Sequence, residues 1–208
     1  MKLTYGNQTI DLFGKEHFPD GPPEKVVVSL SGGCDSSSLT YLIGTNFPNI
    51  DMYPFHTKDE DCPIDTERAI EVHQWLQNKF PKLHDLRIFT VSTSDPVWQA
   101  KAKEAMASPK GSLIVNGKKV SMWGTLNGCS KALQNRDKRS KMSLQYDAPV
   151  VMAMTSNPPV DVQKERGFYE VAERKRDPGE SKLKVMDTID KGGLTYQPYL
   201  RNDKKFVA

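Results

Sequence analysis

A pair of glycines between two regular segments constrains the fold of this chain more than any other feature of its sequence. The run Lys25–Ser31 is rich in β-branched residues, which is typical of a buried parallel strand. Gly32 and Gly33 follow it, and the apolar residues within 39–43 then recur at helical spacing. Because glycine permits backbone angles and close approaches that a Cβ blocks, the segment predicts a strand, a tight turn and a helix in succession.

Further along the chain, strand and helix signals alternate. Strands are predicted at Ile50–His56, Leu86–Val91, Pro149–Thr155 and Thr195–Leu200, and helices at 65–80, 94–107 and 126–138. This alternation predicts an α/β fold, a Rossmann-like parallel sheet with helices on both faces and right-handed crossovers. Ser94 is expected to cap the helix that begins near Pro96. Ligands of such folds bind at the carboxyl ends of the strands, where the glycine turn falls.

The chain length fits a single domain over 1–208. Residues 1–24 are polar and end in a Gly-Pro-Pro run, which predicts an N-terminal arm or a short hairpin. Residues 112–123 hold an Asn-Gly pair between two candidate strands, which indicates a small hairpin insertion. Residues 157–193 are rich in charge, proline and glycine, and we expect a mobile loop region there.

Composition argues against several classes of protein. A formal net charge of +3 does not support nucleic acid as a partner, although it leaves that partner open. There is no apolar run long enough to span a membrane and no signal-peptide core, so a cytoplasmic location without membrane contact is predicted. Cys34, Cys62 and Cys129 form no short pairs, which argues against disulfides and against a structural zinc site. Association into a homo-oligomer is left open.

The turn itself has the composition of an anion-binding site. Its backbone amides, and those of the helix that follows, can converge on an anion, and its serines add hydroxyl donors. No lysine lies in the turn, so phosphate charge must be met by amides, hydroxyls, a metal or distant bases. Asp35 would repel a bare phosphate, but Mg²⁺ prefers a carboxylate together with phosphate oxygens. Helix capping is the alternative role for Asp35.

The residues SGGCDSS at Ser31–Ser37 resemble the SGGxDS signature of the PP-loop ATP pyrophosphatases. These enzymes form the N-type branch of the adenine nucleotide α-hydrolase-like superfamily, and the chain is distantly like one of them, 7-cyano-7-deazaguanine synthase. The resemblance implies that ATP and Mg²⁺ are the cofactors and that ATP is cleaved between its α and β phosphates. It implies that the loop holds the pyrophosphate part of ATP and that Asp35 binds Mg²⁺.

The resemblance also implies a set of site residues. Asp35 and Lys205 are expected to act in catalysis, with a solvated terminal lysine as the alternative for Lys205. Adenine is expected near the end of the second strand, where a structural role is the alternative for His56. The expected ATP-binding residues are Ser29, Ser31, Gly32, Gly33, Cys34, Asp35, Ser36, Ser37, Phe55, His56, Thr57 and Thr155.

Other charged and polar residues are open to two interpretations. Cys34 occupies a variable position of the motif, and packing is its alternative role. The acidic residues 59–61 are either a solvated loop or a source of a second Mg²⁺ ligand. The basic stretch 131–141 is either a solvated helix face or a lid over phosphates.

The activity implied by the resemblance is that of an AMP-forming ligase or synthase. A carboxylate or carbonyl of a small-molecule or nucleobase-type substrate is adenylated with release of pyrophosphate, and an amine or other nucleophile then displaces AMP. The chain lacks the four-cysteine zinc cluster of the deazaguanine synthases and the paired cysteines of the thiolating tRNA enzymes. A non-catalytic ATP- or AMP-binding module and a sulfonucleotide (PAPS) reductase-like protein are the alternatives.

Overall fold

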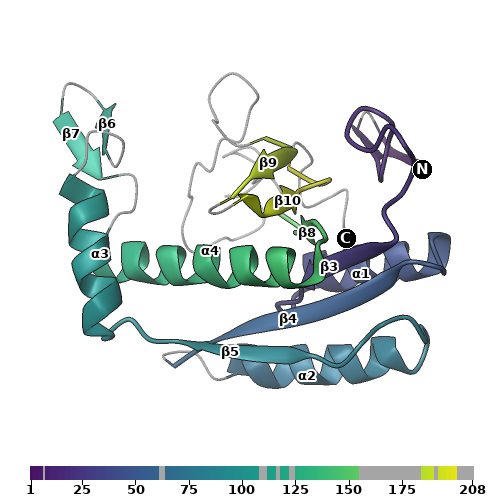
Figure 1. Ribbon diagram of the computed structural model, residues 1–208, viewed down its shortest axis with the longest axis horizontal. Helices are drawn as coiled ribbons and strands as arrows, with labels where there is room; N and C mark the ends of the chain where they lie inside the picture. Colours follow the sequence, from purple (N-terminus) through teal and green to yellow (C-terminus); the bar gives the residue numbers. More distant parts are fainter. Residues whose placement is uncertain are drawn as a thin grey trace.

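A six-stranded sheet forms the centre of the computed structural model, with the strand order β5-β4-β3-β8-β10-β9 (Figure 1). All neighbours from β5 to β10 are parallel, and β9 joins the edge antiparallel to β10. The strands are β3 (Lys25–Ser29), β4 (Asp51–Asp59), β5 (Arg87–Val91), β8 (Val150–Val151), β9 (Met186–Thr188) and β10 (Leu194–Tyr196). The structure describes residues 1–6, 8–60, 64–107, 112–115, 118–121, 125–154, 184–189 and 192–200.

Helices cover both faces of the sheet, as the alternating pattern predicts. The helices are α1 (Cys34–Asn46), α2 (Ile64–Gln77), α3 (Pro96–Ala107) and α4 (Leu126–Tyr146). Figure 1 shows α2 and α4 on opposite sides of β4 and β5. Successive side chains of a strand point to opposite faces. Val26 and Val28 accordingly pack with Leu39 of α1, whereas Val27 packs with Met142 of α4.

Two hairpins flank the sheet. Strands β1 (Lys2–Tyr5) and β2 (Gln8–Asp11) pair antiparallel within the segment predicted to be an N-terminal arm or a short hairpin. The hydroxyl of Tyr196 ties this arm to the sheet, because it accepts from the Phe13 N–H at 3.0 Å and donates to the Asp11 carbonyl at 3.1 Å. Strands β6 (Ser112–Val115) and β7 (Lys118–Ser121) form the second expected hairpin, whose Asn-Gly turn lies outside the described residues.

Several boundaries and one cap differ from the predictions. The strand predicted to begin at Pro149 has only two residues, and α4 continues to Tyr146 rather than ending near 138. Asp95, not Ser94, caps α3, because its Oδ1 accepts from Val97 N at 2.9 Å. Strand β9 was not predicted, and its antiparallel pairing makes the sheet mixed rather than wholly parallel.

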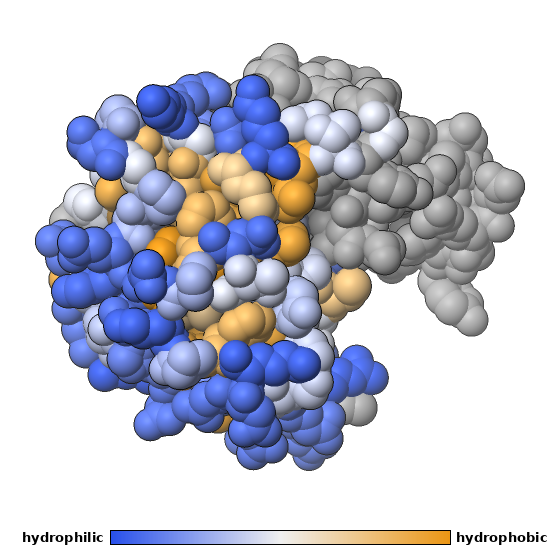
Figure 2. All heavy atoms as spheres, turned by 90° about the vertical axis from the view of Figure 1, so that its right-hand side faces the viewer, coloured by the Kyte–Doolittle hydropathy of each residue, from blue (hydrophilic) through white to orange (hydrophobic). Residues whose placement is uncertain are grey.

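Two predicted features and one surface complete the description. Of the predicted mobile loop region, residues 157–183, 190 and 191 lie outside the described residues. Figure 2 shows the face on the right of Figure 1, where polar side chains surround a strip of apolar ones. Among the helices of the described residues, none is both long and apolar enough to cross a lipid bilayer.

Candidate functional site

The strand order reverses between β3 and β8, and a pocket lies at that point. The chain passes from β3 outward to β4 and β5, then returns to the other side of β3 as β8 and β10. Open sheets of this kind bind ligands at such a reversal, beyond the carboxyl ends of the strands. The pocket measures about 400 Å³, which is a usual size for a small-molecule site. Its walls are Ser29, Ser31, Gly33, Cys34, Asp35, Ser36, Met152, Ala153 and Met154.

The two glycines of the turn have different roles. Gly32 has a positive φ of 76°, and a Cβ there would stand 2.6 Å from the backbone nitrogen of Ala69 in α2. Its missing side chain therefore lets α2 pack against the turn, and Gly32 does not line the pocket. Gly33 has an ordinary φ of −81°, and a Cβ there would meet only the Ser31 hydroxyl, at 3.4 Å. Gly33 thus lines the pocket, and no neighbouring atom of the chain is close enough to exclude a side chain there.

Serine hydroxyls hold the turn in shape. The Ser36 hydroxyl accepts from the Ser31 N–H at 3.1 Å and donates to the Gly33 carbonyl at 3.2 Å. It also lies 3.0 Å from the Ser31 hydroxyl. The Ser37 hydroxyl donates to the same Gly33 carbonyl at 2.7 Å, and Ser37 does not line the pocket. These motif serines therefore serve the loop's own structure.

Helix α1 begins at the pocket wall. Its N-cap is Gly33, so no side chain caps it, and the first amides of any helix lack intrahelical partners. The capping role considered for Asp35 is wrong, because Asp35 lies inside the first turn of the helix. The positive end of the helix dipole and these amides favour an anion in the pocket.

The pocket suits a magnesium ion accompanied by phosphate. Asp35 contributes a carboxylate to the wall. Within the part of the chain that the structure describes, no three acidic, histidine or cysteine side chains gather into a metal site. Mg²⁺ is commonly held by one or two carboxylates plus substrate phosphates, so a single Asp35 fits this ion better than a metal bound by protein alone.

Comparisons with known proteins identify no family for this chain. No family model and no curated protein matches the sequence. A U34-tRNA thiolase from Methanococcus maripaludis is similar, with 14% identity, a TM-score of 0.44, and coverage of 88% of this chain and 54% of that chain. An NH₃-dependent NAD synthetase from Campylobacter jejuni has 18% identity, a TM-score of 0.36, and coverage of 68% and 52%. The chain spans about half the length of these solved structures, and likeness at this level does not identify a function.

The residues predicted near adenine are not among those that line the pocket. Strand β4 continues to Asp59, so Phe55, His56 and Thr57 lie within the strand and not after it. Both ring nitrogens of the buried His56 have protein partners, the Leu30 carbonyl at 3.0 Å and the Thr66 hydroxyl at 3.1 Å. His56 therefore ties the end of β3 to α2. None of the three residues lines the pocket, and the predicted adenine contact gains no support from this geometry.

The later predicted site residues, Thr155 and Lys205, lie outside the described residues, but their neighbours adjoin the site. Met152–Met154, just before Thr155, form one wall of the pocket. Tyr199 is buried and hydrogen-bonds Ser38 on α1. Burial, and next the charges of Asp35 and Cys34, raise the pKa of Tyr199 to about 12 despite that hydrogen bond. The chain before Lys205 thus packs against the start of α1.

Charged residues beyond the loop are partly paired with one another. Asp59, considered as a metal ligand, forms an ion pair with Lys131 of α4. Lys141 and Lys138 both approach Asp137, at 2.8 and 3.9 Å. These pairs favour the interpretation of 131–141 as a solvated helix face for its lysines.

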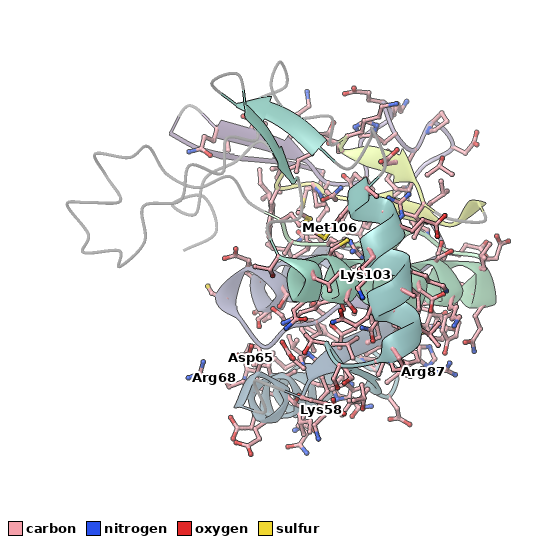
Figure 3. The ribbon with its side chains drawn as sticks, turned by 90° about the vertical axis from the view of Figure 1, so that its left-hand side faces the viewer. Lys58, Asp65, Arg68, Arg87, Lys103 and Met106 are labelled. Atoms are coloured by element: carbon pink, nitrogen blue, oxygen red, sulfur yellow. The ribbon has the colours of Figure 1, made fainter. Side chains whose placement is uncertain are left out.

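The other described cysteine, Cys129 of α4, has a structural role against α3. Cys129 is buried, its thiol donates to the Ala102 carbonyl at 3.7 Å, and burial raises the pKa of that thiol. This environment does not suit a reactive sulfur. Figure 3 looks onto the carboxyl ends of the strands, where α3 crosses in front of α4 and carries Lys103 and Met106.

Proposed function

We propose that this chain is a PP-loop ATP pyrophosphatase that binds Mg·ATP in the β3–β8 pocket and adenylates a substrate. One observation carries the proposal. The uncapped start of α1 and the open side of Gly33 both form the wall of a pocket at the reversal point of the sheet. Backbone N–H groups in this position form an anion site, and the neighbouring Asp35 carboxylate suits the magnesium that accompanies ATP.

The loop residues would divide the work between holding the leaving group and holding the metal. The amides of Gly33 and the first turn of α1 would bind the pyrophosphate portion of ATP. Ser29 and Ser31 offer hydroxyl donors from the pocket wall. Asp35 would hold Mg²⁺, which when bound offsets charge on the phosphates. Charge building up on the departing pyrophosphate would therefore be stabilised by donors already in place.

In the proposed reaction, a carboxylate or carbonyl oxygen of the substrate attacks the α phosphorus. The bond between that phosphorus and the α–β bridging oxygen breaks, and pyrophosphate leaves. An amine or other nucleophile then attacks the activated carbon. The bond from that carbon to the oxygen on phosphorus breaks, and AMP leaves with that oxygen. Lys205 and Thr155 belong to this proposal as contacts to the phosphates.

The substrate class follows from the family resemblance. We propose a small-molecule or nucleobase-type substrate, as in 7-cyano-7-deazaguanine synthase. The cysteine-based zinc cluster of those enzymes has no counterpart in the sequence. A cytoplasmic location and any homo-oligomer remain predictions from the sequence.

Pyrophosphate–ATP exchange tests the proposal directly. The protein is incubated with ATP, Mg²⁺, labelled pyrophosphate and a panel of carboxylates, and label entering ATP reports reversible adenylation. Parallel reactions are analysed for AMP and pyrophosphate against ADP and phosphate. Gly33→Ala is the variant that ties the activity to this pocket, since it places a methyl group on the pocket wall without a clash within the chain.

Four outcomes separate the candidate functions. Exchange by the wild type that is lost in Gly33→Ala supports adenylation at this pocket. Release of ADP and phosphate contradicts it. Tight ATP binding without exchange on any substrate supports the non-catalytic module instead, and preference for PAPS over ATP supports the sulfonucleotide alternative.

A further inference from the structure

Arg139 of α4 has no acidic partner among the described residues, although it is only partly exposed. Its Nε donates to the Asn135 carbonyl at 3.1 Å, within its own helix. Its Nη1 donates to the Met152 sulfur at 3.2 Å. A thioether is a weak acceptor, and the guanidinium carries five N–H donors, so most of its hydrogen-bonding capacity is not met by described groups.

The lysines of this helix differ in that respect. Lys131 pairs with Asp59, and Lys141 pairs with Asp137 at 2.8 Å. Burial, and then the charge of Arg136, lower the pKa of Arg139, so its surroundings oppose a cation. A partly buried charge without a counter-ion reduces folding stability. Such a group is expected where a ligand supplies the opposite charge.

The place of Arg139 identifies the ligand that could do so. Met152, which its guanidinium contacts, forms part of the wall of the β3–β8 pocket. Met152 follows Val151, which pairs with Val28, so this wall stands beside the end of β3. The loop residues on the other wall include no lysine or arginine. The site would therefore receive its positive charge from α4.

A second polar group in the same helical turn is also unmet. The side-chain oxygen Oδ1 of Asn135 is buried and has no hydrogen-bond partner within the described part of the chain. Because buried polar atoms are nearly always hydrogen-bonded, an unmet one next to an unpaired cation indicates surroundings built for a polar ligand.

We propose that Arg139 binds the polyphosphate of the nucleotide in the β3–β8 pocket, from the wall opposite the glycine turn. Phosphate oxygens would replace the Met152 sulfur as acceptors, and the flexible methionine side chain would give way. The planar guanidinium can donate two parallel N–H bonds to one phosphate. This inference rests on the proposed function, because it assumes that the pocket holds a nucleotide.

The test compares Arg139→Met with Arg139→Lys, and with Arg87→Met as the matched control. Arg87 is exposed (Figure 3). Its Nη1 donates to the Gln145 side chain at 2.8 Å. Binding of Mg·pyrophosphate, Mg·ATP and adenosine is measured by calorimetry, and the melting temperature is measured without ligand. Arg139→Met should weaken pyrophosphate and ATP binding between about 10-fold and 100-fold. Adenosine binding should not change, Arg139→Lys should keep part of the affinity, and Arg87→Met should bind as the wild type does.

The melting temperature separates a ligand contact from a structural role. Without ligand, Arg139→Met should melt at the wild-type temperature or above it, because an unpaired cation has been replaced by an apolar side chain of similar length. Loss of affinity together with a lower melting temperature would indicate a structural arginine and overturn the inference.

The binding results separate the inference from the proposed function. Wild-type affinity of Arg139→Met for pyrophosphate overturns the inference and leaves the proposed function standing. The same holds if Arg139→Met binds ATP normally and loses only substrate-dependent exchange, since Arg139 would then contact the substrate. A wild-type protein that binds neither ATP nor pyrophosphate overturns both.

Discussion

The backbone N–H of Ser31 donates to the hydroxyl oxygen of Ser36, five residues later, at 3.1 Å. The same hydroxyl donates to the Gly33 carbonyl at 3.2 Å, so one side chain closes the turn from both ends. The loop is therefore held in its binding shape before a ligand arrives. Preorganised donors lose less conformational entropy when a ligand binds, so the fixed shape of the turn increases its affinity for an anion.

Replacing Ser36 tests that bracing. Ser36→Ala removes the acceptor of the Ser31 N–H, and we expect a loss of about 1–2 kcal/mol in the free energy of unfolding. Affinity for Mg·ATP should fall as well, because the turn loses its fixed shape. Urea unfolding and calorimetric binding check the two effects.

Ser37→Ala is the control for Ser36→Ala. The Ser37 hydroxyl also donates to the Gly33 carbonyl, but Ser37 does not line the pocket. We expect this variant to keep most of its affinity for nucleotide. Equal affinity of Ser36→Ala and the wild type would contradict the bracing role.

The two glycines should separate stability from binding. Gly32→Ala forces a side chain into the left-handed region at a φ of 76° and towards the Ala69 nitrogen, where it would stand 2.6 Å away. The left-handed backbone conformation alone costs alanine about 1–2 kcal/mol, and the clash with α2 adds to this cost. The variant should therefore unfold at a clearly lower urea concentration than the wild type.

Gly33→Ala should behave in the opposite way. Its φ is −81°, and the nearest atom to an added Cβ is 3.4 Å away. The free energy of unfolding should therefore change by less than about 1 kcal/mol. The new methyl group would, however, enter the pocket wall, and nucleotide affinity should fall. Normal binding with impaired folding in this variant would contradict the assigned geometry.

The glycine turn was predictable because its signals are local in sequence. The elements that were missed depend on contacts with residues distant in sequence. The strand, turn and helix at the loop carry their own periodicity and glycines, and the structure agrees with them. Strand β9 has three residues, and its pairing with β10 across a turn leaves no alternating pattern to detect. The end of α4 was missed because polar residues dominate it, with the buried Met142 among them.

The site was predictable to a similar extent. Five of the motif residues that line the pocket follow each other closely in sequence: Ser31, Gly33, Cys34, Asp35 and Ser36. Met152–Met154 could not be chosen from sequence, because their place depends on where the two-residue β8 ends. Arg139 resembled the other basic residues of its helix, and only its contact with Met152 distinguishes it.

Tyr199 should make stability sensitive to alkaline pH. Burial chiefly raises the pKa of Tyr199 from 10.0 to about 12, so the native state holds the phenol proton after the unfolded chain has lost it. Its contribution to stability is therefore complete below pH 10 and is lost as the pH rises towards 12. At about 1.4 kcal/mol per pH unit, the loss over this range is on the order of 3 kcal/mol.

Urea unfolding at a series of pH values from 9 upward checks this prediction. Tyr199→Phe should show a shallower alkaline decline than the wild type. Burial likewise raises the pKa of Tyr196 to about 12, so the wild type keeps a second such group and the decline should not vanish. An unchanged slope in Tyr199→Phe would show that Tyr199 titrates normally.

Alkylation of Cys34 should report directly on ligand in the pocket. Cys34 is exposed, lines the pocket and is the first residue of α1, whereas Cys129 is buried. In a Cys62→Ser background, iodoacetamide should therefore modify Cys34 first, as followed by intact mass. Saturating Mg·ATP should slow this reaction in proportion to the occupied fraction of the pocket, because bound phosphates cover the thiol and repel a thiolate. Mg²⁺ alone serves as the control and should leave the rate unchanged. If calorimetry shows ATP bound while Cys34 reacts at its original rate, the nucleotide lies elsewhere on the protein.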